Sequence, residues 1–357
     1  MSKGTGSATI TCTGADNTTK TCEVNSLASI QYTNSGTTNT TITGATTGFS
    51  YNNPVVPEGF SAVNTNDAKW SNLSTDYNKG LVIMDSKGNQ FVWVPVDGTT
   101  ITYAKWCTNG IAWNASGISD DTLPTGITNE NAQITTYGGF YVGRYESGLD
   151  VDLGSASQQT ANTSNRNKNT INPIIVEGAS PWNYIGYTYS KENAERMYSN
   201  TEVQSGLLTG KQWDTTMEFI QDVGEKSGTE DNVNVNSKGW GIYKDSVRIL
   251  DRYKMLSTDK GASWTSKTPA NGETYPKTTN DISQLLRTGS STETKVLNIS
   301  DIAGNLWEWT NECVDDYCIL RGGCYDNNAS NSAGYRGNNS AGNAGNLTGF
   351  RVVLYLK

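Results

Sequence analysis

The chemistry open to this 357-residue chain is limited by the complete absence of histidine. Without an imidazole, the chain can form neither a Ser-His-Asp or Cys-His catalytic arrangement nor a histidine-ligated metal site. No two cysteines have the Cys-x-x-Cys spacing, which excludes a zinc ribbon and a thioredoxin motif. Carboxylate chemistry, cysteine chemistry without a histidine base, and no catalysis at all remain open.

The cysteines could instead form disulfides. Cys12 and Cys22 flank a short polar loop, and Cys313 and Cys318 are spaced in a similar way. Either pair could be bridged if the protein meets an oxidising environment. The alternative is that all six cysteines are free and mostly buried thiols, and the sequence leaves both possibilities open.

Four carboxylates near the C-terminus are the candidates for a carboxylate-based enzyme, namely Glu308, Glu312, Asp315 and Asp316. Glu308 lies between Trp307 and Trp309, in a motif whose structural role is described below. The other three are predicted to lie on a solvated acidic turn. The sequence therefore favours a protein without catalytic activity, with a carboxylate-based enzyme as an alternative.

The composition indicates a folded, loop-rich protein. Charged residues make up only 17% of the chain, whereas asparagine occurs 38 times and glycine 37 times. Ten tryptophans and 18 tyrosines can still close a core, since each ring buries a large area. The net charge of −8 offers no basic stripe, so we expect no nucleic-acid partner. No apolar run approaches the roughly 18–20 residues that span a bilayer, and we expect no signal peptide.

Residues 1–52 differ in composition from the rest of the chain. Fifteen of the first 50 residues are threonine, and residues 8–12 and 29–32 alternate with the period of half-buried strands. Two prolines at positions 54 and 57 make the next segment rigid and extended. We therefore expect a small β-rich appendage or stalk over residues 1–52, followed by a second domain over residues 53–357.

The second domain is predicted to mix strands, two helices and long coil. Residues 80–85 and 89–96 predict a hairpin, and residues 139–146 predict a third strand. Further strands are expected near the C-terminus, the last of them over residues 350–356. Residues 225–294 are polar and lack periodic runs. This order is typical of an α+β fold with much irregular structure.

Two helices are expected between these strands. One is predicted to begin at Ser190. The other has Thr209 at its N-cap and Gln212 three residues later, which is the spacing of a capping box. Its apolar face carries Trp213 and Met217, and Gly224 is expected to end it.

Five pieces of the chain, in this order, resemble the formylglycine-generating-enzyme (sulfatase-modifying factor) family, a branch of the C-type lectin fold. They are residues 139–146, the Trp213 helix, Gly304-Asn305-Leu306-Trp307-Glu308-Trp309, Arg321-Gly322-Gly323 and Gly349-Phe350-Arg351. The resemblance spans residues 53–357. It implies a C-type lectin fold of the formylglycine-generating-enzyme type, α+β with much irregular coil, preceded by the small β-rich appendage.

The resemblance also shows where the family's oxidases bind copper. In those enzymes Arg-Gly-Gly-Ser-Phe is followed closely by two cysteines spaced five apart. The corresponding positions here hold Asn327 and Ser332, and Cys324 stands where the family has serine. A site with two thiolates cannot form at this spacing. We therefore expect no copper and no oxidase activity.

A calcium motif of the same family is a separate question. It maps onto the Asp301 side chain, the Gly304 and Leu306 backbone carbonyls and the Glu308 side chain. Two carboxylates and two carbonyls so close together suit a hard cation that prefers oxygen ligands, so the resemblance implies a Ca²⁺ site. The alternative is that Asp301 and Glu308 cap turns and accept hydrogen bonds from backbone N–H groups.

The segment between the last two motifs, residues 324–348, is almost free of aliphatic side chains. Asparagine recurs in it among Gly, Ser, Ala, Asp and Tyr. A fixed frame around such a segment resembles the variable proteins of diversity-generating retroelements, in which adenine-directed mutagenesis places such residues on an exposed lectin surface. Tyrosine supplies rigid contact area and the small polar residues supply adaptable hydrogen bonds. The alternative is an ordinary Asn- and Gly-rich loop that fills space.

This resemblance assigns ligand contacts to ten residues of the segment: Tyr325, Asp326, Asn327, Asn328, Asn331, Ser332, Tyr335, Asn338, Asn339 and Asn343. All of them except Tyr325 and Asn328 are expected to share one exposed face. The residues of the frame are expected to be buried or structurally engaged, and they are Trp307, Trp309, Arg321 and Phe350. Substitutions in a variable segment must stay off the core, because replacing a buried aromatic residue costs roughly 3–5 kcal/mol.

Together these features predict a non-catalytic protein that binds a protein or glycan ligand on a host or neighbouring cell. We expect it to be extracellular, on a virion or a bacterial cell surface, with the appendage attaching it to a larger structure. A structural pilus or virion decoration protein without a specific ligand is the first alternative. The carboxylate-based enzyme is the second.

Overall fold

The structure is a computed structural model of the whole chain. It describes residues 49–102, 110–112, 117–120, 122–149, 163–200, 202–251, 256–265 and 277–357, and the backbone alone of residues 7–13 and 19–25.

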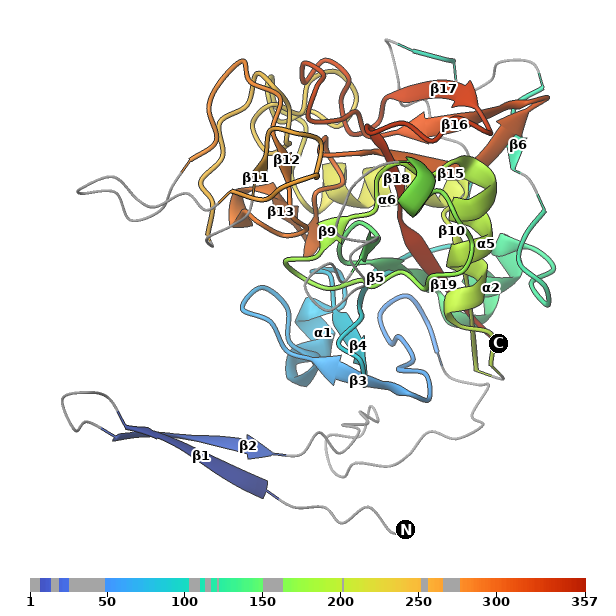
Figure 1. Ribbon diagram of the computed structural model, residues 1–357. Helices are drawn as coiled ribbons and strands as arrows, with labels where there is room; N and C mark the ends of the chain where they lie inside the picture. Colours follow the sequence, from blue (N-terminus) through green and yellow to red (C-terminus); the bar gives the residue numbers. More distant parts are fainter. Residues whose placement is uncertain are drawn as a thin grey trace.

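A six-stranded sheet lies at the centre of the fold (Figure 1). Every neighbouring pair in it is antiparallel. Its strands, in sheet order, are β10 (Val203–Leu207), β19 (Val352–Leu356), β7 (Gly139–Gly143), β5 (Gln90–Pro95), β4 (Val82–Asp85) and β3 (Phe60–Val63). The hairpin predicted from residues 80–96 is confirmed as β4 and β5, and the third predicted strand as β7.

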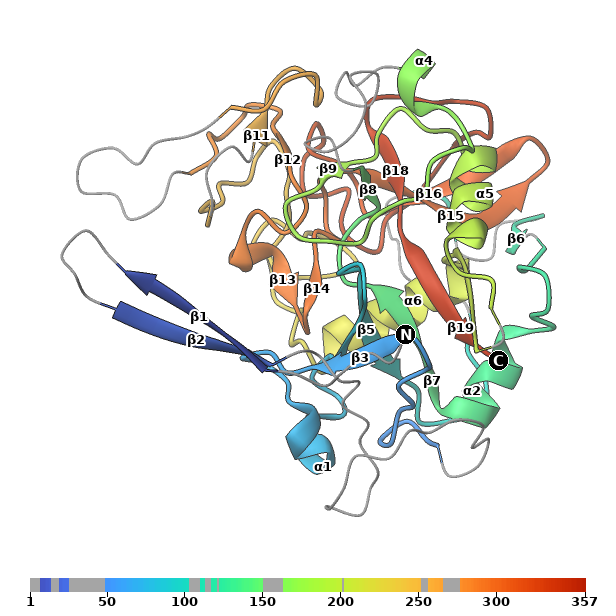
Figure 2. The ribbon, with the colours of Figure 1, turned by 60° about the horizontal axis from the view of Figure 1, so that its bottom comes forward.

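Helix α6 (Gly210–Asp222) covers one face of this sheet (Figure 2). The predicted capping box is confirmed. The Thr209 hydroxyl accepts from Gln212 N at 3.2 Å, and the side-chain oxygen Gln212 Oε1 accepts from Thr209 N at 3.1 Å. Trp213 and Met217 are fully buried against the apolar side chains of β5 and β7, as the periodicity predicts.

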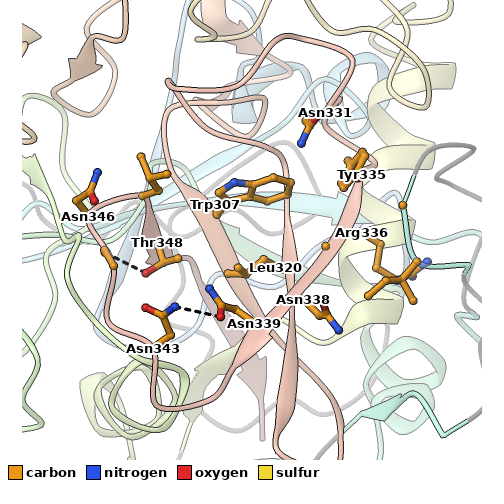
Figure 3. A pocket seen from close by; sticks show the side chains of 15 residues that line it. Trp307, Leu320, Asn331, Tyr335, Arg336, Asn338, Asn339, Asn343, Asn346 and Thr348 are labelled. Carbon is orange, nitrogen blue, oxygen red and sulfur yellow. Dashed lines mark hydrogen bonds between the residues drawn. The ribbon is translucent and has the colours of Figure 1, made fainter.

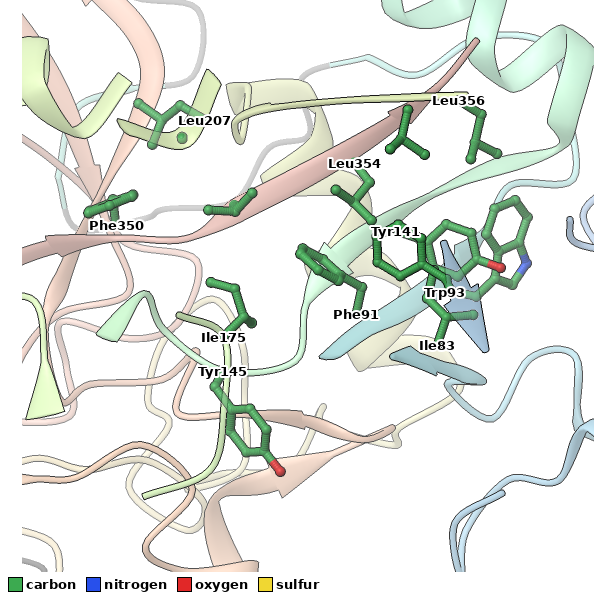
Figure 4. Close-up of a cluster of buried hydrophobic side chains, with 14 of the residues drawn as sticks. Ile83, Phe91, Trp93, Tyr141, Tyr145, Ile175, Leu207, Phe350, Leu354 and Leu356 are labelled. Atoms are coloured by element: carbon green, nitrogen blue, oxygen red, sulfur yellow. The ribbon is translucent and has the colours of Figure 1, made fainter. Parts of the chain in front are cut away.

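Helix α5 (Tyr187–Met197) borders the core on the other face, where Phe91 and Tyr141 pack (Figure 4). The helix begins three residues before the predicted start, with Gly186 as its N-cap. Ser190 lies inside the first turn, and its hydroxyl donates to the Gly186 carbonyl at 3.0 Å. The prediction is wrong because a serine can satisfy its hydroxyl within a helix, by bonding to the carbonyl four residues earlier.

A second sheet carries the C-terminal motifs. Its strands, in order, are β17 (Arg336–Ser340), β16 (Tyr317–Arg321), β15 (Trp307–Val314) and β18 (Thr348–Phe350), and β6 (Ser119–Asp120) pairs with the far end of β15. Strand β18 is parallel to β15, and the other pairs are antiparallel.

One continuous segment joins the two sheets. The chain leaves β18 at Phe350, passes through Arg351 and continues as β19 in the central sheet (Figure 1). The single strand expected over residues 350–356 is therefore wrong in one respect, since the residues on either side of Arg351 belong to different sheets. The Arg351 guanidinium holds this junction by donating to the carbonyls of Gly143 and Ser300, each at 3.0 Å.

The remaining elements are short. The helical turns are η1 (Trp70–Asn72), α1 (Leu73–Asp76), α2 (Glu130–Tyr137), α4 (Thr163–Arg166) and η2 (Thr292–Thr294). The small strand pairs are β8 (Gly148–Leu149) with β9 (Ser180–Pro181), β11 (Leu256–Ser257) with β12 (Leu285–Leu286), and β13 (Lys295–Val296) with β14 (Ile299–Ser300). No helix in the described part of the chain is long and apolar enough to cross a bilayer.

Near the N-terminus, β1 (Ser7–Thr13) and β2 (Thr19–Asn25) form an antiparallel hairpin. The strand predicted over residues 8–12 is confirmed, and the one over residues 29–32 lies outside the described residues. The register places Cys22 opposite Ile10, two residues from Cys12 along β1. A Cys12–Cys22 disulfide stays a prediction, as does the division into domains at residue 52.

Candidate ligand-binding pocket

A cavity of about 500 Å³ lies over the second sheet (Figure 3). Leu320 of β16 lines it, whereas the next residue, Arg321, points to the opposite face, because successive side chains of a strand alternate. Five of the residues predicted to contact a ligand line this cavity: Asn331, Tyr335, Asn338, Asn339 and Asn343. The structure thus brings half of the predicted contacts to one place.

An aromatic pair forms the apolar part of the pocket. The ring of Trp307, which is half-buried, lies at 62° to the ring of Tyr335 with the centroids 5.6 Å apart. A Cβ atom added to Gly337 would lie 3.6 Å from the Trp307 ring, so this ring packs closely over the backbone of β17. Trp307 belongs to the frame and not to the variable segment, and it is structurally engaged as expected.

Amide groups form the polar part of the pocket. Asn339 Oδ1 accepts from Asn343 Nδ2 at 3.0 Å and from Ser340 N at 2.9 Å. Within the part of the chain that the structure describes, no side-chain hydrogen bond involves Asn331 or Asn338. The Asn331 amide keeps a donor group and an acceptor group for a ligand. Asn338 lies opposite Ile319 in the β16–β17 register, so its side chain points to the face opposite that of Leu320 and Gly337.

Under the pocket, two arginines and two carboxylates form a fully buried quartet. Arg336 donates to Asp214 Oδ2 at 2.8 Å and to Glu312 Oε1 at 3.1 Å. Arg321 donates to Glu312 Oε2 at 3.2 Å and also to Asp214. All four side chains have no exposed surface. The quartet fixes β16 and β17 to helix α6, because Arg321 of β16 and Arg336 of β17 both pair with Asp214 of α6. Removing one member would leave an uncompensated buried charge.

Two predicted contact residues are buried, and the exposed position expected for Ser332 is wrong. Tyr325 packs in an apolar cluster with Leu285 and Leu306, and its hydroxyl accepts from Asn346 at 3.0 Å. Ser332 is completely buried in the turn before β17, where its carbonyl accepts from Tyr335 N. Both sit where the segment crosses the core, and composition alone does not reveal this.

Three further predicted contacts do not line the pocket. Asp326 accepts a hydrogen bond from the Ser283 hydroxyl, and Asn327 Oδ1 accepts from Cys324 N at 3.2 Å. Asp326 and Asn328 are exposed, whereas Asn327 is half-buried. The expected single exposed face is therefore divided between this turn and the pocket. The expected burial of Trp309, Arg321 and Phe350 is observed, since none of them has exposed surface.

The carboxylates of the calcium motif are occupied by protein donors. Both oxygens of Glu308 accept from Arg351, the shorter distance being 2.6 Å. The Asp301 oxygens accept from Gly289 N at 2.6 Å and from the Thr294 hydroxyl at 2.8 Å. As arranged here, these groups do not fit a cation unless Arg351 moves. The calcium site stays a prediction that the structure does not test.

A third carboxylate beside this motif was missed by the sequence reasoning. Glu146 accepts from Leu306 N at 3.0 Å and from Asn305 Nδ2 at 2.6 Å. Burial raises the pKa of Glu146 well above its usual range, and the carboxylates of Glu308 and Asp301 raise it further. In the described residues, no group of three or more Cys, Asp or Glu side chains has a metal-binding arrangement.

The acidic turn predicted near the end of β15 is only partly solvated. Asp315 and Asp316 are exposed, as expected, but Glu312 is fully buried in the quartet. Its placement on a solvated turn is wrong, because a carboxylate paired with two arginines can be buried. No local feature of the sequence signals its partners Arg321 and Arg336, which are 9 and 24 residues away along the chain.

The cysteines of the C-terminal part have two different states. Cys313 and Cys318 form a disulfide across the β15–β16 hairpin, which is one of the two bridges that the spacing allowed. Cys324 is a free, buried thiol, and burial raises its pKa to about 12, which disfavours the thiolate. The two positions that carry thiolates in the family's oxidases hold Asn327 and Ser332, so the donor set there does not fit copper.

The C-terminal part of the chain matches a known protein family. Residues 249–356, which include β15 to β19, match the family described as "Sulfatase-modifying factor enzyme 1-like domain". This region is similar to that family, and the match covers less than half of the chain. It supplies every residue of the pocket described above except those contributed from residues 110–111.

Solved structures similar to the chain are distant from it. PvdO from Pseudomonas aeruginosa shares 15% identity at a TM-score of 0.36, over 78% of this chain and 98% of that one. Treponema denticola variable protein 1 shares 13% identity at a TM-score of 0.35, over 75% and 96%. CarF shares 12% identity at a TM-score of 0.31, over 67% and 96%. No curated protein matches the chain.

Proposed function

We propose that the protein binds a ligand in the pocket of Trp307, Tyr335 and the surrounding asparagines without catalysing a reaction on it. The observation that carries this proposal is that five predicted contact residues line one cavity above a fully buried charge quartet. A rigid frame under a surface of Tyr and Asn side chains is the arrangement that lets contacts vary while the fold persists.

We further propose that the pocket is diversified, as in the retroelement variable proteins that the segment resembles, and that the protein acts outside the cell. The Cys313–Cys318 disulfide supports an oxidising location. A reverse-transcriptase gene and a near-copy of the coding segment for residues 324–350 beside this gene would support diversification. Their absence would favour the structural decoration protein.

Binding is tested with the variant Asn331→Ala/Asn339→Ala/Asn343→Ala. Labelled protein is applied to a panel of bacterial and animal cells, and bound label is measured by flow cytometry. We expect binding to be lost while the free energy of unfolding changes by less than about 1.5 kcal/mol, since surface substitutions each cost at most about 0.5 kcal/mol.

The matched control replaces two exposed asparagines outside the pocket, Asn66→Ala/Asn72→Ala. It should bind as the unsubstituted protein does. If the triple variant keeps full binding, or loses it only because it unfolds, the pocket is not the ligand site.

A further inference from the structure

The pocket offers hydrogen bonds without offering charge. Among the described residues that line it, Arg336 is the only one with a permanent charge, and its guanidinium is buried against Asp214 and Glu312. An ionic ligand group would lose its hydration there without gaining a counter-charge. The amide of Asn331 instead requires a partner that both donates and accepts, which is a property of the hydroxyl group. Asn339 Nδ2 and Asn343 Oδ1, which are not used in the bond between these two residues, add a donor and an acceptor.

The pocket also offers a flat apolar surface beside these amides. Figure 3 shows the Trp307 ring between Asn331 and Tyr335 on one side and Asn346 on the other, with Leu320 below it. Because Trp307 is only half-buried, part of its ring is left for contact with a ligand. The ligand must therefore combine a patch of C–H groups with several hydroxyls.

The volume limits the size of such a ligand. A cavity of about 500 Å³ lies within the roughly 300–1,000 Å³ of small-molecule sites. A protein partner would need contacts over roughly 800 Å² of this chain, far beyond one pocket. A pyranose ring has a C–H face, a rim of hydroxyls and a size that fits.

We infer that the pocket binds a pyranose ring of an uncharged glycan. Trp307 contacts the C–H face of the sugar, and Asn331 and Asn339 hydrogen-bond to its hydroxyls. Trp307 lies outside the variable segment, so it supplies a constant contact while the asparagines around it set which sugar is bound. This inference rests on the proposed function, because it takes this pocket to be the ligand site.

The test applies the full chain to an immobilised panel of neutral and sialylated oligosaccharides, in the presence of EDTA. We expect at least one neutral glycan to bind. Trp307→Ala should weaken that binding at least tenfold, as is common for a tryptophan at the centre of a contact. Trp307→Tyr should restore most of it. The control Trp264→Ala replaces another half-buried tryptophan, outside the pocket, and should leave binding unchanged.

Three results would overturn the inference: no glycan bound, binding confined to sialylated glycans, or equal binding by Trp307→Ala. The cell assay then separates this failure from failure of the proposed function. A protein ligand in the same pocket would be identified by three results together. Cell binding would depend on the three asparagines, would survive periodate oxidation of the cells and would be destroyed by protease. Cell binding that does not depend on the asparagines refutes both proposals.

Discussion

Arg336 Nη2 donates a hydrogen bond to Asp214 Oδ2 at 2.8 Å, and this contact fixes the middle of the asparagine-rich segment to helix α6. Arg336 begins β17, so the next residues of that strand are presented to the pocket from a fixed point. The segment 324–348 is therefore an exposed segment that is held to the core in its middle by the buried Arg336 side chain.

Replacing this anchor should destabilise the whole protein. Arg336→Met leaves Asp214 and Glu312 with only one buried arginine between them. We expect a loss of about 3–5 kcal/mol in the free energy of unfolding, as for other broken buried ion pairs. Urea denaturation followed by tryptophan fluorescence measures it. Asn338→Ala, two residues along the strand, is the control and should change stability by about 0.5 kcal/mol at most. Similar stabilities for the two variants would contradict the anchor.

Tyr325 should be equally intolerant of substitution, although it lies in the segment predicted to vary. Its ring is buried in the cluster with Leu285 and Leu306. Tyr325→Ala should cost about 3–5 kcal/mol, which is typical of a buried aromatic side chain. Asn328→Ala, at a nearby exposed position, should cost almost nothing. The melting temperatures of the two variants at equal concentration give the comparison. An unchanged melting temperature for Tyr325→Ala would show that this residue is not part of the core and can vary.

The sequence predicts those parts of the fold whose causes are local. The capping box of Thr209 and Gln212 and the hairpin of β4 and β5 each depend on a few adjacent residues, and both are confirmed. Arg351 shows the limit of such reasoning. Residues 350–356 are continuous in apolar character, but only long-range contacts with Gly143 and Ser300 show that the chain changes sheets there.

The site is predictable to a similar extent. Composition and motif order locate the segment, and five of ten residues meet in the pocket. Burial of Tyr325, Ser332 and Glu312 could not be read from the sequence, because tyrosine, serine and glutamate occur both on surfaces and in cores. Arg336 was missed for the same reason, since its two partners are distant in the chain.

The calcium motif can be tested through stability. A cation bound only to the folded state would raise the melting temperature. Because both Glu308 oxygens are held by Arg351, we expect the melting temperature to agree within about 1 °C in calcium and in EDTA. A larger increase in calcium that Glu308→Gln abolishes would show that the cation displaces the arginine, and would restore the site implied by the family resemblance.

The two proposed disulfides can be separated by mass mapping after alkylation under denaturing, non-reducing conditions. Cys324 should be alkylated, and Cys313 and Cys318 should be recovered as one linked peptide. If the native location is oxidising, Cys12 and Cys22 should also be linked. The register places Cys22 opposite Ile10, so this bridge requires the two strands to shift toward direct pairing of the cysteines. Alkylation of Cys12 and Cys22 in protein recovered from its native particle would argue against an extracellular location.

A cluster of carboxylates at the far end of β15 should make stability depend on pH. Asp120 accepts from Gly210 N at 2.9 Å and lies 3.5 Å from Lys211 Nζ. Burial, together with the neighbouring carboxylates of Glu130 and Glu312, raises the pKa of Asp120 to about 7. Its ordinary value is 3.8.

Because the folded pKa is the higher one, the folded protein binds more protons than the unfolded chain between pH 4 and pH 7. Stability from this group is therefore complete below pH 4 and is lost as the pH rises through 7. A rise in pKa from 3.8 to about 7 corresponds to at most about 4 kcal/mol over this window.

Asp120→Asn should remove this dependence. We expect the variant to gain stability relative to the unsubstituted protein between pH 5 and pH 8, because asparagine keeps an acceptor for Gly210 N but cannot ionise. Urea midpoints measured at pH 5, 6, 7 and 8 give the comparison. Asp315→Asn, at an exposed position on the same hairpin, should follow the unsubstituted protein at every pH. Parallel pH profiles for Asp120→Asn and the unsubstituted protein would show that Asp120 is ionised throughout this range, with Lys211 compensating its charge.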